Sequence, residues 1–225
     1  MKTTRFVYFC SGAAEATADR LLYKLARTVL VSDASRKILI LDLALNRTSS
    51  PWNDRFAINN AGLGLSDMLA DYLQYRARLN TGEDVGVYRS KPEDYFYGST
   101  DDIEPGRLWL MPVGSMPDTQ YAQVDWDAFY REQGHAFMKL LKAAIRKQGF
   151  TDVLIESDPG LSDTFYIAAL ELADVVACLT EDTQRVSPTA QRMLAVLRDP
   201  NAIEIYGQKR LVACSPEAAG QALGI

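Results

Sequence analysis

The sequence predicts an α/β protein with a doubly wound, mostly parallel sheet flanked by helices. Short runs of β-branched, aliphatic and aromatic residues alternate along the chain with segments whose apolar residues recur every three or four positions. The run at residues 38–43 is almost continuously apolar, as expected of a parallel strand that helices cover on both faces. Repeated units of this kind form right-handed crossovers, and such sheets bind ligands beyond the carboxyl ends of their strands.

Each element follows from its local pattern. Strands are expected at residues 6–10, 38–43, 108–113, 153–156, 175–179 and 211–214. In residues 16–31 apolar side chains line one face and basic side chains the other, which predicts an amphipathic helix. Further helices are expected around residues 137–145 and 193–197. The length of 225 residues suits a single domain that spans residues 1–225.

Composition excludes several classes of protein. Three cysteines are too few and too scattered for a disulfide framework or a cysteine-based zinc site, and a single histidine excludes a His–His metal site within one chain. The chain has no run of about 18 apolar residues that would span a membrane. Its net charge is −5, so strong nucleic-acid binding is not expected. We expect a cytoplasmic protein whose thiols are reduced, buried and inert.

One segment departs from the α/β pattern. Residues 80–107 form an acidic excursion rich in tyrosine, and its aromatic residues include Tyr88, Tyr95, Phe96 and Tyr97. Such a segment is ordinarily a solvated loop. The alternative is a surface that binds a protein partner, because aromatic side chains are enriched among the residues that anchor protein interfaces.

The segment after the first predicted strand stands where a phosphate-binding loop would lie. It reads Ser11-Gly12-Ala13-Ala14-Glu15-Ala16-Thr17-Ala18. A working loop needs glycines so that backbone N–H groups can curl around phosphates, a lysine for the phosphate oxygens, and a Ser or Thr hydroxyl for Mg²⁺. Gly12 and Thr17 meet these needs, but Ala16 precedes Thr17 and the segment contains no lysine. By itself the segment predicts a turn of small residues that caps a helix.

Six partial motifs in order along residues 5–198 nevertheless resemble the ParA/MinD family, the deviant-Walker-A ATPases that position DNA and other cargo. The family loop K-G-G-V-G-K-T-T aligns with residues 11–18 position for position. The other motifs are a strand ending in D-x-D (38–46), a G-L-x-D-V-L helix start (64–69), an L-x-L-L-P-A-G strand (108–114), the Walker B region (151–161) and an A-L-x-x-A-D-x-V-L stretch (167–176). The resemblance implies a P-loop NTPase-like fold of the ParA/MinD type.

The resemblance also implies that the residues at the catalytic positions differ from those of the family. The two loop lysines of the family fall on Ser11 and Ala16, and the aspartate that orients the attacking water falls on Ala44. Asp42 remains, and the Walker B aspartate is replaced by Glu156, which is one methylene longer. Because phosphoryl transfer depends on positioned charges, we expect the hydrolysis of ATP to be negligible.

These positions define a vestigial nucleotide site without catalytic residues. Its members would be Ser11, Gly12, Ala13, Ala14, Ala16, Thr17, Asp42 and Glu156. The resemblance then implies a pseudo-ATPase without a bound cofactor, which scaffolds, positions or regulates part of a larger cellular machine. Its protein partners would include a second copy of itself or an active relative. Residues 216–225 lack the basic amphipathic tail by which MinD-type proteins hold a membrane.

Two other functions stay open at this point. In the first, the chain is a weak nucleotide-binding switch that dimerises with ATP or ADP and keeps Mg²⁺ through Thr17, Asp42 and Glu156, with an arginine such as Arg47 in place of the lysine. In the second, it is an amide or carboxylate ligase of the cobyrinate or dethiobiotin type. That chemistry would need an intact phosphate loop even more.

Overall fold

The computed structural model describes residues 4–11, 18–44, 52–58, 62–89, 91–101, 105–114, 129, 134–158, 160–179, 188–215 and 218–224. In chain order its elements are β1 (Arg5–Ser11), α1 (Ala18–Ser32), β2 (Ile38–Leu43), α2 (Leu65–Asn80), the 3₁₀ turn η2 (Pro92–Tyr95), β3 (Tyr97–Gly98), β4 (Leu108–Met111), α5 (His135–Lys147), β5 (Asp152–Ser157), α6 (Asp163–Tyr166), the π-helical segment η4 (Ile167–Leu172), β6 (Val175–Leu179), α7 (Pro188–Leu197), α8 (Pro200–Tyr206), β7 (Arg210–Cys214) and α9 (Ala219–Leu223).

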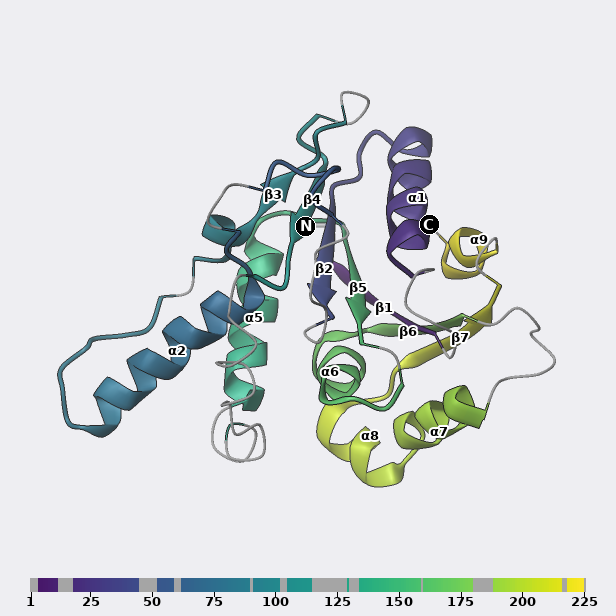
Figure 1. Ribbon diagram of the computed structural model, residues 1–225. Helices are drawn as coiled ribbons and strands as arrows, with labels where there is room; N and C mark the ends of the chain where they lie inside the picture. Colours follow the sequence, from purple (N-terminus) through teal and green to yellow (C-terminus); the bar gives the residue numbers. More distant parts are fainter. Residues whose placement is uncertain are drawn as a thin grey trace.

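The strands of the described residues form one seven-stranded sheet in the order β3-β4-β2-β5-β1-β6-β7 (Figure 1). Neighbouring strands pair in parallel, except that the short edge strand β3 is antiparallel to β4. The predicted doubly wound, mostly parallel sheet is therefore confirmed. Each of the six predicted strands is present, and β3 is an addition within the tyrosine-rich excursion.

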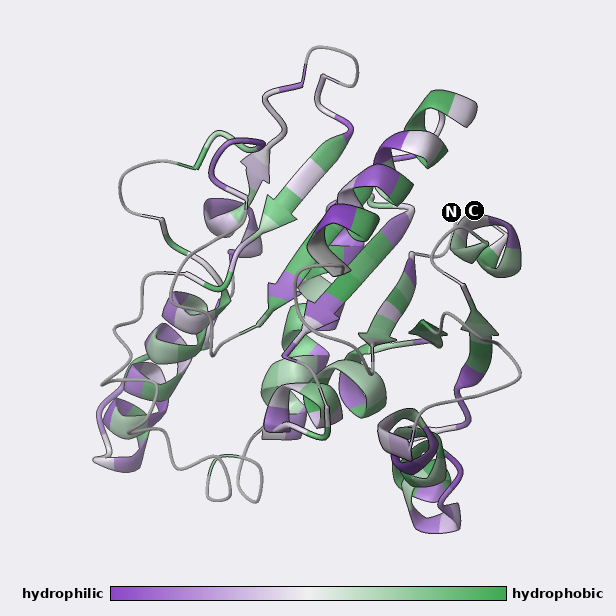
Figure 2. Ribbon diagram, turned by 45° about the vertical axis from the view of Figure 1, so that its right-hand side comes forward, coloured by the Kyte–Doolittle hydropathy of each residue, from purple (hydrophilic) through white to green (hydrophobic). Residues whose placement is uncertain are grey.

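Helices cover both faces of this sheet and enclose two apolar clusters. On one face, α1 and α9 pack over side chains such as Val7, Ile40 and Leu154. On the other face, α2, α5, α6, η4 and α7 pack over side chains such as Tyr8 and Leu41. Figure 2 shows hydrophobic residues dominating the central strands, whereas the long helices carry both colours. Among the described residues, no helix has the length and apolar character needed to cross a bilayer.

The two longest predicted helical patterns bury the faces that their periodicity indicates. In α1 the side chains of Leu22, Ala26 and Val29 are buried, three or four positions apart. In α5 the buried side chains are Phe137, Met138, Leu141 and Ile145. Each large side chain buried in this way contributes about 1.5–3 kcal/mol at most to the free energy of folding.

Helix α2 is docked by its first turn onto the carboxyl end of β4. The N–H groups of Leu65 and Ser66 donate to the carbonyls of Pro112 and Val113, at 2.9 and 2.7 Å. At the helix start the N–H of Gly64 donates to the carboxylate of Asp67, which caps the first turn. Beyond this contact, α2 and the segment that follows it extend away from the sheet (Figure 1).

Candidate functional site

Two acidic side chains lie next to each other at the carboxyl edge of the sheet. Asp42 in β2 and Glu156 in β5 are paired in register on adjacent parallel strands, so both side chains point to the face covered by α1. Their side chains are buried, with 2% and 0% of their surface exposed. Two neighbouring carboxylates repel each other when both are ionised. A cation or a proton at this pair would relieve that repulsion.

Asp42 accepts hydrogen bonds at both carboxylate oxygens. The backbone N–H of Ala44 donates to Oδ1 at 2.9 Å, and the indole Nε1–H of Trp52 donates to Oδ2 at 2.9 Å. Trp52 is fully buried and meets the ring of Phe56 edge to face at 5.9 Å between centroids. The buried carboxylate of Asp42 is therefore stabilised by hydrogen bonds from the protein itself.

Trp52 is a site residue that sequence reasoning missed. It lies ten positions after Asp42, beyond the predicted strand and outside every motif of the resemblance. A tryptophan in a polar stretch that follows a buried aspartate is a signal in retrospect, because a buried indole N–H needs an acceptor. The hydrogen bond between Trp52 and Asp42 depends on the path of the chain after β2, and the local sequence pattern does not predict that path.

Ala44 occupies the place at which the resemblance puts a water-orienting aspartate. Its side chain is a methyl group with 1% exposure, and its backbone N–H binds Asp42. A methyl group neither accepts a proton nor orients a water molecule. At this position the chain has packing and a backbone hydrogen bond in place of a carboxylate.

The phosphate-loop positions fall largely outside the described residues. Gly12, Ala13, Ala14, Ala16 and Thr17 lie in the undescribed stretch 12–17, and so does Arg47 in the stretch 45–51. Ser11 is the last residue of β1, where its backbone pairs in register with Leu179 of β6. The loop therefore begins directly at the carboxyl edge, one strand away from Glu156.

The donor set for a metal ion consists of two carboxylates among the described residues. No group of three or more His, Cys, Asp or Glu side chains suited to a metal occurs in that part of the chain. Mg²⁺ commonly binds through one or two carboxylates together with water and substrate phosphates. Asp42 and Glu156 supply oxygens of the right kind, so they fit Mg²⁺ that arrives with a nucleotide. By themselves, these two described carboxylates do not complete the coordination shell of a metal ion.

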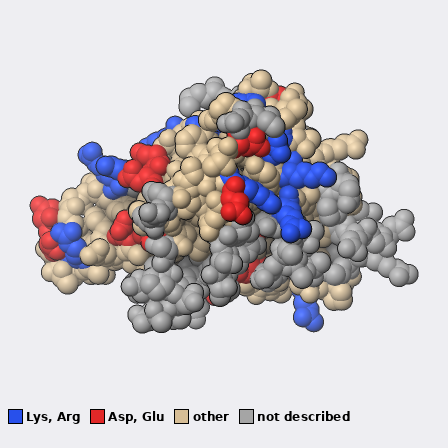
Figure 3. All heavy atoms as spheres, turned by 45° about the horizontal axis from the view of Figure 1, so that its top comes forward, with Lys and Arg blue, Asp and Glu red and all other residues tan. Residues whose placement is uncertain are grey.

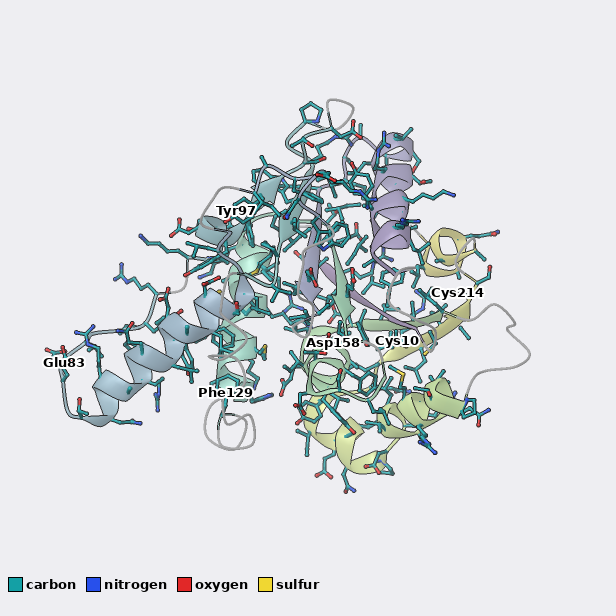
Figure 4. All side chains as sticks on the ribbon, viewed as in Figure 1. Cys10, Glu83, Tyr97, Phe129, Asp158 and Cys214 are labelled. Atoms are coloured by element: carbon teal, nitrogen blue, oxygen red, sulfur yellow. The ribbon has the colours of Figure 1, made fainter. Side chains whose placement is uncertain are left out.

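On the opposite face of the same edge, a chain of buried polar groups links β1, β5 and α6. The hydroxyl of Tyr8 lies 2.8 Å from that of Ser157, and Ser157 donates to the carbonyl of Asp158. Thr164 of α6 donates to the carboxylate of Asp158 at 3.1 Å. Figure 4 labels Asp158 at this edge. The network ties the end of β5, which carries Glu156, to the helix that follows it.

The four aromatic residues proposed as a partner surface pack onto the body of the protein to different extents. Tyr95 and Tyr97 are 9% and 6% exposed and belong to the two apolar clusters, so the core covers these two side chains. Tyr95 also donates to the carboxylate of Asp71 in α2 at 2.7 Å. Tyr88 and Phe96 are half-buried. Only these two of the four offer surface to a partner.

The surface charge on the face shown in Figure 3 is mixed. Lys and Arg side chains lie among Asp and Glu side chains on the described part of that face. Several basic groups are also engaged within the chain. For example, Lys142 donates to Asp174 at 2.8 Å, and Arg27 pairs with Asp101 at 3.0 Å. Binding to a nucleic-acid backbone would favour an unpaired basic stripe instead.

Three solved structures resemble this fold over nearly the whole chain. Cobyrinic acid a,c-diamide synthase from Mycobacterium smegmatis, with a bound ATP analog and magnesium, superposes with a TM-score of 0.60 at 13% identity, covering 93% of this chain and 70% of that one. The septum site-determining protein MinD from Pyrococcus horikoshii OT3, complexed with Mg-ADP, gives 0.54 at 17% identity, covering 97% and 77%. The kinase domain of the Escherichia coli tyrosine kinase ETK gives 0.55 at 14% identity, covering 95% and 68%.

The chain has the MinD fold. No model of a protein family matches the sequence, and no curated protein matches it significantly. At the identities given above, the likeness concerns the fold, and it confirms the fold type that the partial motifs implied. Two of these similar structures contain a nucleotide: MinD was solved with Mg-ADP, and the synthase with an ATP analog and magnesium. They also differ in activity, so the fold alone assigns none.

Proposed function

We propose that this chain is a ParA/MinD-like pseudo-ATPase, which acts through protein partners as a scaffolding, positioning or regulatory component. The observation that carries the proposal is the hydrogen bonding of the Asp42 carboxylate. In the resemblance this aspartate belongs to the D-x-D motif that acts on the attacking water and the metal. Here Trp52 and the Ala44 N–H bind its two oxygens, and the second aspartate is an alanine. These contacts give Asp42 a structural role at the end of β2.

The composition of the loop supports the same function. Neither Ser11 nor Ala16 supplies the positive charge that the family lysines would bring to the phosphates. Each positioned charge of this kind contributes orders of magnitude to phosphoryl transfer. Without these groups, backbone N–H groups and the start of α1 are the means of holding a phosphate, and they favour weak binding over turnover.

An ATPase assay tests the catalytic part of the proposal. The purified chain is incubated with radiolabelled ATP and Mg²⁺, beside a Thr17→Ala variant and an active ATPase of the same fold as a positive control. We expect phosphate release at the rate of the protein-free blank from both the wild type and the variant. Release by the wild type that requires Mg²⁺ and falls at least tenfold in Thr17→Ala would overturn the proposal.

A second function is favoured by one specific observation, the adjacency of Asp42 and Glu156. Two neighbouring carboxylates at the carboxyl edge suit a Mg²⁺-nucleotide, so the chain would act as a nucleotide-binding switch. Calorimetry with ATP and ADP separates the two functions. The pseudo-ATPase gives little or no binding heat, whereas the switch gives a Mg²⁺-dependent heat that Glu156→Gln reduces. Light scattering with and without nucleotide then shows whether the binding drives dimerisation.

A further inference from the structure

Cys10 and Cys178 are direct neighbours on two parallel strands. They are paired in register near the ends of β1 and β6, and both side chains point to the face that carries Tyr8. The two Sγ atoms lie 2.9 Å apart. Both residues are buried, with 3% and 2% of their surface exposed. The sequence alone predicted inert, buried thiols, because the cysteines lie within apolar strand runs, and 168 positions separate Cys10 from Cys178 along the chain.

The strand geometry suits a covalent bond between these sulfurs. Adjacent strands in a sheet lie about 4.7–4.9 Å apart, and disulfides join Cα atoms that are about 4.4–6.8 Å apart. We propose that Cys10 and Cys178 form a reversible dithiol–disulfide pair, which hydrogen peroxide oxidises, so that β1 and β6 become linked one residue before the loop that follows Ser11. This inference holds whether or not the chain binds a nucleotide.

The surroundings assign the two sulfurs different roles. The hydrogen bond between the two thiols and the positive charge of Arg198 lower the pKa of Cys178. The same hydrogen bond and burial raise the pKa of Cys10. Cys178 is therefore the sulfur that reacts first, because the thiolate is the nucleophile. Hydrogen peroxide suits a buried pair, since it is scarcely larger than water.

The reaction balances in two steps. In the first, the Cys178 thiolate attacks one oxygen of hydrogen peroxide, the O–O bond breaks, and hydroxide leaves, which produces a sulfenic acid. In the second, the sulfur of Cys10 attacks the sulfur of Cys178, and the hydroxyl group leaves with the Cys10 proton as water. The hydroxide takes up the proton that Cys178 lost on ionising, so two thiols are oxidised to one disulfide and one hydrogen peroxide is reduced to two molecules of water.

Cys214 provides a matched control within the same sheet. It lies in β7, the next strand, where it pairs in register with Leu179 and not with Cys178. Its side chain belongs to the apolar cluster on the opposite face of the sheet. It is as buried as Cys10, at 3% exposure, but it faces away from the pair. In Figure 4, Cys10 and Cys214 are labelled on different strands.

Peptide mapping of the oxidised full chain tests the proposal. The native protein is treated with hydrogen peroxide and then unfolded in the presence of N-ethylmaleimide, which blocks the free thiols, and the non-reduced digest is analysed by mass spectrometry. We expect a peptide that links Cys10 to Cys178, with Cys214 carrying the maleimide, and we expect dithiothreitol to reverse the link. A disulfide that includes Cys214, a link between two chains, or Cys10 and Cys178 both recovered as free thiols would overturn the proposal.

A thermal melt supplies a second readout. Cross-linking residues 168 positions apart restricts the unfolded chain, so oxidation is expected to raise the melting temperature by several degrees. The rise should occur in wild type and in Cys214→Ser, and it should be absent from Cys10→Ser. A rise of the same size in Cys10→Ser would contradict the proposal. The mapping of the wild-type protein stands even if a serine variant folds poorly.

Discussion

The indole of Trp52 donates a 2.9 Å hydrogen bond to the carboxylate of Asp42 inside the protein. This contact joins the turn at residues 52–55 to the end of β2, and neither side chain is exposed to more than 2%. A carboxylate buried to this degree destabilises a fold unless hydrogen bonds or a cation compensate its lost hydration. Trp52 and the N–H of Ala44 provide that compensation, which explains how the chain tolerates Asp42 beside Glu156.

Replacing Trp52 by phenylalanine is expected to destabilise the protein by about 1–3 kcal/mol. Phenylalanine keeps an aromatic ring but removes the donor, so Asp42 loses a hydrogen bond in a buried site. Urea unfolding monitored by circular dichroism measures the change. The control is Trp109→Phe, because the indole of Trp109 donates to the Gly106 carbonyl near the surface and its loss should cost under about 0.5 kcal/mol. Equal costs for the two variants would mean that Trp52 acts through its volume alone.

A methyl group at Gly64 is expected to disrupt the docking of α2 on β4. A Cβ built there would lie 2.2 Å from the Pro112 carbonyl oxygen and 2.4 Å from the Gly114 nitrogen, which are both backbone atoms. Because backbone atoms cannot move away as the end of a flexible side chain can, Gly64→Ala should lower the free energy of unfolding by about 1–3 kcal/mol or more. Gly98→Ala is the matched control, since its Cβ would meet nothing closer than 3.9 Å. If Gly98→Ala proved the more destabilising of the two, the docking contact would be wrong.

The phenol of Tyr88 should titrate late and reduce stability at alkaline pH. Burial against Tyr72 and Tyr75 raises its pKa from the ordinary 10 to about 12. Between these values the unfolded chain releases the proton and the folded chain keeps it. The free energy of unfolding therefore falls as the pH rises above about 10. Absorbance at 295 nm, as the difference between wild type and Tyr88→Phe, follows this group, and a midpoint at pH 10 would show a solvated phenol.

The fold could be predicted from the sequence largely because buried parallel strands leave a continuous apolar run. Residues 38–43 are all buried in β2, as their composition indicated. β3 could not be predicted, because a strand of two residues, Tyr97 and Gly98, is too short to show an alternating hydrophobic pattern. It forms only by pairing with the edge of β4. The start of helix α8 is recognisable in the sequence, because Asp199 followed by Pro200 is a favourable N-cap sequence. In the structure Asp199 caps this helix.

The candidate site was predictable in part. The rule that ligands bind at the carboxyl ends of strands places Asp42 and Glu156 at one edge of the sheet from the sequence alone. Their adjacency depends on the strand order β2-β5-β1, which local patterns do not encode. The same holds for Cys10 and Cys178, which become neighbours because β6 pairs with β1. Contacts between elements that are far apart in the sequence could therefore not be predicted from local patterns.

Asp152 at the amino edge of the sheet is expected to be far more important for stability than its exposed neighbour Asp33. Its side chain is 1% exposed and accepts from the guanidinium groups of Arg5 and Arg36, both at 2.7 Å. Asp33 binds the same Arg36 at 3.2 Å, but its side chain is 42% exposed. Replacing Asp152 by alanine removes the buried carboxylate that both guanidinium groups share, and breaking such a buried pair typically costs about 3–5 kcal/mol. Asp33→Ala should cost far less than Asp152→Ala, because water screens an exposed pair.

Urea unfolding of both alanine variants and of Asp152→Asn measures these costs. Asparagine keeps the shape and one acceptor, so it should recover part of the loss and identify how much of it is due to charge. Raising the salt concentration should weaken the contribution of Asp33 and leave that of Asp152 nearly unchanged, because screening reaches exposed pairs far more than buried ones. If Asp152→Ala and Asp33→Ala cost the same, the strands β1, β2 and β5 do not depend on this buried carboxylate to hold their amino ends together.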